Sequence, residues 1–149
     1  MKLNYDCVRD VLLYIEENIE YINTDNNLAH KSLNFGQVIK GLPKYEKNDV
    51  IYSIEKLFEA RFIVLTSLYR NNSGEITKAQ IADITWNGHD FLNNIREEVV
   101  WDATKIAANK VKAVSVFTLK TISAQIIKML ITNSGVINSA VEMIGKIIP

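Results

Sequence analysis

The amino-acid sequence predicts a mainly α-helical α+β protein. Across most of the 149 residues, apolar side chains recur every three or four positions, which is the pattern of amphipathic helices. Two short segments rich in β-branched residues flank the turn-forming residues 71–74, which is the pattern of a β-hairpin. Hydrophobic residues make up 48% of the chain and charged residues 23%, a balance that excludes a disordered protein.

The first third of the chain is predicted to hold a long helix and a short strand. The helix spans Tyr5–Ile22, with apolar residues along one face and mainly acidic residues along the other. Residues 23–27 are turn-prone and end this helix. Leu33, Phe35 and Val38 then predict the short strand.

A second helix and a hairpin follow. The helix opens at Asn48 or Asp49 and runs to about Ala60, because its apolar residues again keep helical spacing. A strand over residues 62–65 comes directly after it, and Ile76–Thr85 forms the returning strand of the hairpin.

The rest of the chain is predicted to be helical. One helix begins near His89 and either continues past Asp102 or breaks there. Residues 115–149 differ in composition, since only four of them are charged. Residues 133–135 separate an apolar helix at the start of this segment from a shorter helix over 136–148.

The order of these elements is close to that of a winged helix, in which a helical core supports a β-hairpin wing. The weak element is the helix that normally precedes the recognition helix, because only residues 37–42 remain for it. We therefore predict a winged-helix-like domain over residues 1–98, followed by a C-terminal helical extension over residues 99–149.

The segment Thr85–Leu92 carries the pattern Thr-Trp-x-Gly-His-x-Phe-Leu. Together with the helical segments Asp6–Glu16 and Val50–Leu57, it resembles a bacterial and phage family known only as domain of unknown function 2513. The resemblance covers about residues 1–112. It implies a winged-helix-like fold, and it implies no activity because none is established for the family.

This sequence departs from the family pattern at two positions and in its tail. Ser53 stands where the family usually has histidine, and Arg61 stands where it usually has glycine. Beyond Val114 the tail is longer and more apolar than the short helical tail that is common in the family.

Nucleic-acid binding depends on the helix in the recognition position. Between Glu46 and Ala60 it carries two lysines against four acidic residues, a net charge of −2 that would repel phosphate. Basic residues lie nearby and form the candidate nucleic-acid contacts: Lys31, Lys40, Lys44, Lys47, Arg70 and Lys78. We favour the interpretation that these residues form a solvated surface, and DNA binding stays the alternative.

Neither an enzyme nor a metal or cofactor site is expected. His89 could act as a base or a metal ligand only if Asp83, Asp90 and His30 converged on it, and a structural role is favoured. Cys7 is best interpreted as an inert, buried thiol. The sequence has no phosphate-binding glycine loop and no nucleophile elbow.

The two tryptophans flank the helix after the hairpin. Trp86 and Trp101 could stack on nucleic-acid bases, but large aromatic side chains more often pack a helix against a sheet. We therefore expect both indole rings to lie in the core.

The apolar tail allows three interpretations. It could pair with the same segment of a second chain, complete the core of its own chain, or lie at a membrane interface. Self-association is favoured, through Leu119, Ile122, Ile126, Met129, Leu130, Ile137 and Ile144. Integral membrane insertion is not expected, because the chain has no run of roughly 18 apolar residues.

These observations predict a non-enzymatic bacterial or phage accessory protein that acts through protein–protein contacts. Its partners are expected to be a second copy of itself and an unidentified protein. The single cysteine and the absence of a signal peptide predict a cytoplasmic location. The alternative is a DNA-binding transcriptional regulator whose wing and basic loop residues contact phosphates.

Overall fold

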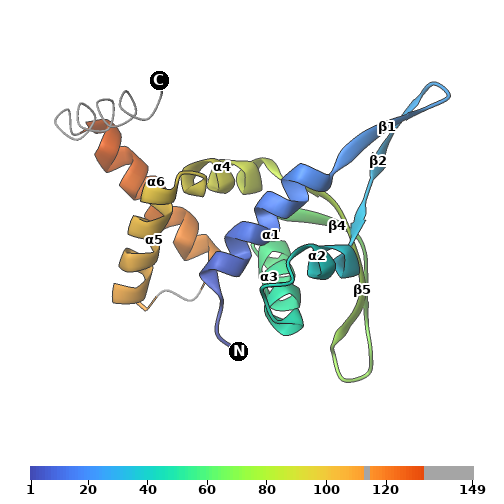
Figure 1. Ribbon diagram of the computed structural model, residues 1–149, viewed down its shortest axis with the longest axis horizontal. Helices are drawn as coiled ribbons and strands as arrows, with labels where there is room; N and C mark the ends of the chain where they lie inside the picture. Colours follow the sequence, from blue (N-terminus) through green and yellow to red (C-terminus); the bar gives the residue numbers. More distant parts are fainter. Residues whose placement is uncertain (113–114, 133–149) are drawn as a thin grey trace.

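The computed structural model describes residues 1–112 and 115–132. Helix α1 lies near the middle of the molecule, with the strands on one side and α5 and α6 on the other (Figure 1). In chain order the elements are α1 (Tyr5–Asn18), β1 (Glu20–Thr24), β2 (Asn27–Lys31), β3 (Leu33–Asn34), α2 (Phe35–Gly41), α3 (Lys47–Glu59), β4 (Ile63–Arg70), β5 (Ile76–Ile84), α4 (Trp86–Ile95), α5 (Glu98–Lys110) and α6 (Val116–Thr132).

The first part of the chain has a winged-helix-like arrangement, as the sequence predicts. A three-stranded antiparallel sheet has the order β3-β5-β4, and β4 and β5 form the wing. Helix α2 leads into α3, which takes the place of the recognition helix directly before the wing. The fold is mixed α+β and mainly α, again as predicted.

The short helix that the sequence indicated only weakly is present as α2. The predicted strand keeps only its first two residues, since Phe35 and Val38 lie in the helix. Asn34 explains the early helix start. Its side chain accepts from the Gln37 N–H, and the Gln37 side chain accepts from the Asn34 N–H, a reciprocal capping box.

The predicted end of α1 is wrong. The helix stops at Asn18, and a second hairpin, β1–β2, replaces the predicted last turn and loop. Asp25 and Asn26 both have positive φ, 28° and 75°, which is the backbone of the two-residue turn that matches strand twist in a hairpin. This turn outweighs the helical spacing of the apolar residues at the end of the predicted helix.

The boundaries of α4 and α5 also differ from the prediction. Helix α4 begins at Trp86 rather than near His89, because the Thr85 side chain caps it by accepting from the Gly88 N–H at 3.0 Å. The break falls after Ile95 rather than near Asp102, and α5 begins at Glu98.

Gly88 allows α4 to lie directly on the turn between α3 and β4. A Cβ at this position would overlap the carbonyl oxygen of Phe62. Thr85 fastens the same turn, since its Oγ1 donates to the Arg61 carbonyl at 2.7 Å and its N–H donates to the Phe62 carbonyl at 2.9 Å. The threonine and glycine of the Thr-Trp-x-Gly-His pattern thus have a structural role.

One hydrophobic cluster joins the winged-helix-like part to the helices after it. Helix α1 buries one complete face in it, and α5 and α6 contribute Trp101, Ala108, Val116 and Leu119. The core therefore continues across residue 98, and the predicted domain boundary there stays a prediction.

The side chain of Arg9 on α1 holds the junction between α4 and α5. Its Nε donates to the Ile95 carbonyl at 2.9 Å and its Nη2 to the Arg96 carbonyl at 2.7 Å. Its Nη1 pairs with the carboxylate of Glu98 at 3.3 Å. Because carbonyls at the end of a helix have no partner within the helix, this guanidinium satisfies groups that the break would otherwise leave open.

Two further contacts fix α1 to the later helices. The Asp6 carboxylate accepts from Trp101 Nε1 at 2.8 Å and from Lys105 Nζ at 2.9 Å. Burial raises the pKa of Asp6, but these two donors outweigh it and hold the pKa below its ordinary value. At the other end of α1, the Arg96 guanidinium donates to both oxygens of Glu16 and lowers its pKa.

Replacing Arg9 with lysine tests the junction. Arg9→Lys keeps the positive charge but loses the planar guanidinium whose Nε and Nη2 donate to the two carbonyls, so we expect the free energy of unfolding to fall by about 1–2 kcal/mol. Urea unfolding followed by circular dichroism measures it. Arg61→Lys, the same change at an exposed arginine, serves as the control. Equal stability of the two variants would contradict this role of Arg9.

Candidate interaction site between helix α3 and the wing

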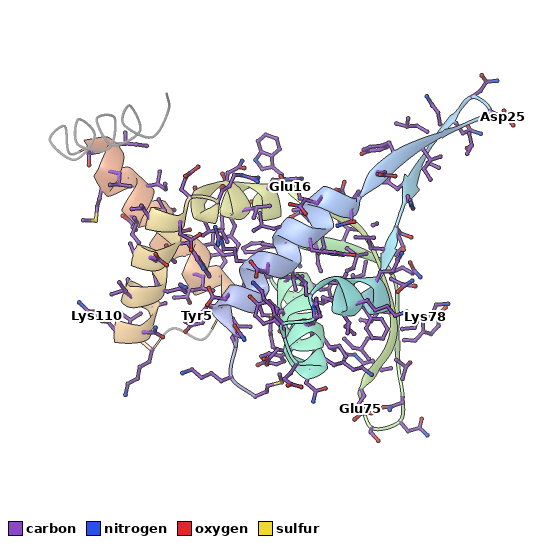
Figure 2. The ribbon with its side chains drawn as sticks, in the orientation of Figure 1. Tyr5, Glu16, Asp25, Glu75, Lys78 and Lys110 are labelled. Carbon is purple, nitrogen blue, oxygen red and sulfur yellow. The ribbon has the colours of Figure 1, made fainter. Side chains whose placement is uncertain are left out.

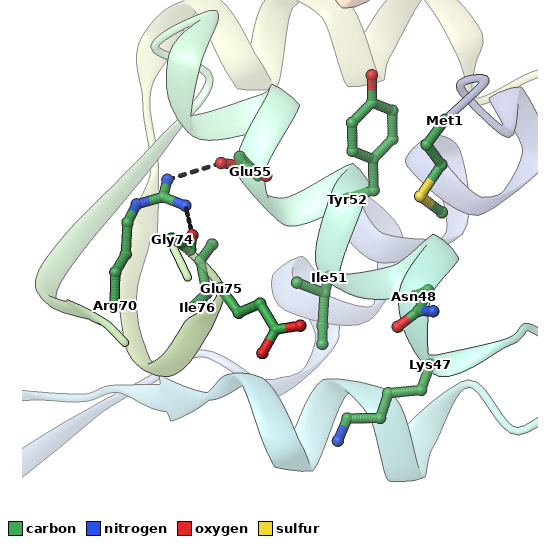
Figure 3. Close-up of a pocket in the computed structure, with 10 residues that line it drawn as sticks. All are labelled: Met1, Lys47, Asn48, Ile51, Tyr52, Glu55, Arg70, Gly74, Glu75 and Ile76. Carbon is green, nitrogen blue, oxygen red and sulfur yellow. Dashed lines mark hydrogen bonds and ion pairs between the residues drawn. The ribbon is translucent and has the colours of Figure 1, made fainter. Parts of the chain in front are cut away.

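A groove of about 310 Å³ lies between α3 and the end of the wing. The helix contributes side chains from successive turns, and the wing contributes the end of β4, the turn and the start of β5 (Figure 3). The lining residues are Met1, Lys47, Asn48, Ile51, Tyr52, Glu55, Arg70, Gly74, Glu75 and Ile76.

Arg70 fixes the wing to α3. Its Nη2 donates to Glu55 Oε1 at 2.6 Å, and its Nη1 donates to the carbonyl of Gly74 at 2.9 Å (Figure 3). One guanidinium thus closes the wing turn and joins it to the helix. The pair is partly exposed, with 40% of the arginine side chain and 24% of the glutamate side chain accessible.

The wing turn is ordered by its own residues. The Asn71 side chain accepts from the N–H groups of Ser73 and Glu75, and it donates to the Glu75 carboxylate at 2.8 Å. Gly74 has a φ of 82°, which glycine adopts without strain. The wall of the groove is therefore a defined structure, and the sequence correctly predicted a turn here.

The charges in the groove are balanced. Lys47 and Arg70 bring two positive charges, and Glu55 and Glu75 bring two negative charges. The apolar side chains of Ile51 and Ile76 and the ring of Tyr52 also line the groove. The groove therefore suits a surface with both apolar and polar groups better than a row of phosphates.

The six candidate nucleic-acid contacts do not act as one group. Lys31 pairs with Glu20 at 3.8 Å, Lys44 pairs with Asp10 at 2.6 Å, and Arg70 pairs with Glu55. The hydrogen bond to Asp10 also raises the pKa of the Lys44 ammonium.

The other three candidate nucleic-acid contacts lie on different elements. Lys78 lies on the wing with its Nζ 5.6 Å from the centre of the Tyr69 ring (Figure 2), and Lys40 lies in the last turn of α2. Lys47 is at the start of α3. Only Lys47 and Arg70 line the same groove.

A family model described as "Hypothetical protein (DUF2513)" matches residues 2–115. The chain belongs to this family. The match confirms the resemblance carried by the Thr-Trp-x-Gly-His pattern and by the two amphipathic helices. No curated protein and no solved structure matches the chain.

The segment matched by the DUF2513 model ends one residue before α6 begins. Helix α6 nevertheless contributes to the same core. Val116, Leu119 and Ser123 are buried, and Ile122 packs against the cluster. The core-completing interpretation thus holds for the first two turns of α6.

Self-association through all seven predicted tail residues is not compatible with this packing. Leu119 is buried in its own chain, so it is corrected to a core residue. Ile122, Ile126 and Leu130 are half-buried, and Met129 is 67% exposed. Ile137 and Ile144 lie outside the described residues.

The expectation for the two tryptophans is half right. Trp101 is fully buried, whereas Trp86 is 87% exposed, and its predicted core position is wrong. The helical phase explains the difference. Trp86 is five residues before the buried Phe91, which turns its side chain away from the face that packs on the core.

Of the three residues that would have to converge on His89, only Asp90 lines the same hollow. The His30 ring contacts the Tyr21 ring in a tilted arrangement with ring centres 4.2 Å apart, and Asp83 accepts from the N–H of Ile84. His89 lines a shallow hollow of about 100 Å³ with Trp86, Asp90 and Asn93. Within residues 1–112 and 115–132 there is no cluster of three or more His, Cys, Asp or Glu that could hold a metal.

The described helices include none with the length and apolar character that a membrane span needs.

Cys7 lies on the core face of α1 and is fully buried. Burial raises the pKa of its thiol to about 11, the carboxylates of Asp49 and Asp10 act in the same direction, and the Ser53 hydroxyl offsets only part of this effect. Since the thiolate is the reactive form, the folded thiol is poorly nucleophilic.

The native protein is therefore expected to leave Cys7 unreacted with a thiol reagent such as DTNB at pH 8. The same protein in urea should react with one equivalent at once. As a matched control, Ser115→Cys places an exposed thiol at the start of α6 and should react without urea. Rapid labelling of the native wild-type chain would contradict the assignment of Cys7 as a core residue.

Proposed function

We propose that this member of the DUF2513 family is a non-enzymatic, winged-helix-like protein that acts through protein–protein contacts. The groove between α3 and the wing is the contact surface for its partner. The observation that carries this proposal is the ion pair between Arg70 and Glu55, which engages one of the two basic groups of the groove within the chain itself. A cytoplasmic accessory role in a bacterium or phage agrees with the family resemblance.

The charge of α3 supports a protein partner over DNA. A recognition helix supplies Arg, Lys, Asn or Gln to phosphates and base edges, and here the corresponding segment carries a net charge of −2. Arg70 would have to leave Glu55 and the Gly74 carbonyl before it could meet a phosphate. The apolar side chains that line the groove together with the balanced charges instead provide the area that a protein contact buries.

Fluorescence anisotropy with mixed-sequence duplex DNA tests this proposal against the DNA-binding alternative. We expect the wild-type chain to bind weakly at low salt. Glu55→Gln should raise the affinity by about two- to fivefold, because it frees Arg70 from a surface ion pair. It should also make the slope of log K against log salt steeper, by the amount expected for about one additional phosphate contact.

Glu17→Gln is the matched control, because it removes one exposed carboxylate on α1, away from the wing. It should change DNA binding less than Glu55→Gln. Tight binding by the wild-type chain that weakens steeply with salt would favour a DNA-binding regulator and contradict the protein-contact proposal.

The proposal includes self-association through the second half of α6. Met129 and Ile131 are 67% and 65% exposed, and Ile126 and Leu130 are half-buried beside them. Ile122, Ile126, Met129 and Leu130 keep the spacing of an apolar stripe that continues beyond the part of α6 packed on its own chain. A second copy offers the same stripe and would cover this one.

Met129→Lys tests the α6 contact by sedimentation velocity over a concentration series. We expect the average mass to fall relative to wild type, because a charge would be buried in the interface. Ile106→Lys places the same charge at an exposed apolar position of α5 and should leave the mass unchanged.

Equal mass distributions for the two variants would remove the α6 contact from the proposal. Substitution is a cleaner test than removal of the tail, because a chain ending before α6 would lose Val116 and Leu119 from the core.

A further inference from the structure

The β1–β2 hairpin projects from the body of the protein as an arm. Every residue of both strands is exposed, and Asp25 at its tip lies far from the wing tip at Glu75 (Figures 1 and 2). The arm nevertheless carries apolar side chains, since Tyr21, Leu28 and Ile22 are 59%, 68% and 40% exposed. A two-stranded hairpin is at best marginally stable in water by itself.

The edges of this arm differ from the free edge of the wing. The β4–β5 ladder has three register shifts, and β-bulges of this kind twist an edge and discourage pairing with another chain. The β1–β2 ladder runs without interruption from the Glu20–Lys31 pair to the Thr24–Asn27 pair. Within its strands there is no proline, and their only charged residues at neutral pH are that first pair. The arm therefore lacks the devices that normally protect an edge strand.

The turn determines which backbone groups of β1 are free. In an antiparallel ladder, hydrogen-bonded and non-hydrogen-bonded pairs alternate, and the pair that flanks a two-residue turn is of the hydrogen-bonded kind. The Thr24–Asn27 pair flanks the turn, so the pairs of Tyr21 and Asn23 are non-hydrogen-bonded. The N–H and C=O groups of Tyr21 and Asn23 consequently point outward along the edge.

We propose that β1 pairs antiparallel with β1 of a second copy, with the two-fold axis at Ile22. Tyr21 then lies opposite Asn23 of the second copy, and Asn23 lies opposite its Tyr21. In both pairs the outward-facing N–H and C=O groups of one copy form hydrogen bonds with those of the other. The two hairpins thus join into one four-stranded sheet. This contact is distinct from the groove and from α6, and it goes beyond the proposed function.

The side chains of β1 are compatible with this register. Glu20 lies opposite Thr24 of the second copy, so like charges do not meet. Ile22 lies beside Ile22 of the second copy on one face, a β-branched cross-strand pair of the kind that stabilises sheets. Because the strands are antiparallel and each arm projects from its body (Figure 1), the two-fold axis places the two bodies at opposite ends of the new sheet.

The other edge of the arm is less suitable. Pairing through β2 would place Ala29 at the two-fold axis and His30 opposite Leu28 of the second copy, so it would offer less apolar area at the centre. Pairing through β1 centres on Ile22 and places Tyr21 next to it.

A cysteine at the two-fold axis tests the register. In the proposed sheet the two Ile22 residues form a non-hydrogen-bonded pair, whose Cα atoms lie about 4.5 Å apart. That distance suits a disulfide, which spans roughly 4.4–6.8 Å between Cα atoms. Ile22→Cys should form a disulfide-linked dimer under mild oxidation. Ala29→Cys, opposite Ile22 on β2, should remain largely monomeric on a non-reducing gel.

Proline substitutions test the edge itself. Asn23→Pro removes an outward N–H of β1 and leaves the ladder to β2 intact, whereas Leu28→Pro does the same on the β2 edge. Both are made in the full chain carrying Met129→Lys, which isolates the arm from the α6 contact. By sedimentation velocity, Met129→Lys alone and with Leu28→Pro should be dimeric, and with Asn23→Pro it should be monomeric.

The other outcomes overturn the proposal. A monomeric Met129→Lys chain, or equal cross-linking at positions 22 and 29, would mean that the arm has a different partner or none. Loss of the dimer with Leu28→Pro but not with Asn23→Pro would assign the contact to the β2 edge. None of these outcomes bears on the groove between α3 and the wing, which is tested separately.

Discussion

The arrangement of the helices depends on one side chain of α1, Arg9. Its guanidinium reaches the carbonyls of Ile95 and Arg96, where α4 ends, and the carboxylate of Glu98, where α5 begins. Its Cζ also lies 5.9 Å from the centre of the buried Trp101 ring. A helix end that faces the core needs partners for its last carbonyls, and a planar group with several donors can serve two of them together. With this junction fixed, α5 packs on α4 and α6 and contacts α1 through Asp6, and α6 can add Val116 and Leu119 to the same core.

Ion pairs among the described residues join segments that lie far apart in the sequence. Asp6 binds Lys105, Glu16 binds Arg96, Asp10 binds Lys44, and Glu55 binds Arg70. Each partly exposed pair adds little stability by itself, but together they use basic groups that a nucleic-acid surface would need to leave free. Asp10 also accepts from the Tyr45 hydroxyl at 2.6 Å, so Lys44 and Tyr45 are both drawn toward α1. The electrostatics of this winged-helix-like protein therefore hold its own elements together, and the groove beside α3 is left without net charge.

The sequence predicted those elements whose local pattern and tertiary environment agree. Helix α3 and the wing fall in this class, since apolar spacing and the Asn-Asn-Ser-Gly turn indicate the same structure that the core requires. The β1–β2 arm was missed because its apolar residues continue the spacing of α1 while the Asp25-Asn26 turn redirects the chain. Trp86 was wrongly predicted to lie in the core because the prediction used its residue type. Its position along the turns of α4 determines its exposure instead. The pairing of Arg70 with Glu55 could not be predicted, because residues 15 positions apart meet only when β4 returns alongside α3.

Two of the places where the described residues expose apolar groups are the second half of α6 and the β1 edge of the arm. A contact of either kind between identical chains is isologous and closes after two copies. A chain with two different isologous contacts does not stop at a dimer. Each copy then has two neighbours, which are related to it by two separate two-fold axes. Such an arrangement closes only if the axes meet at a suitable angle, and otherwise it extends as a filament. Helix α1 leads directly into the arm, and α6 packs on α4 and α5, so the way these helices pack would determine whether the proposed assembly is closed or open.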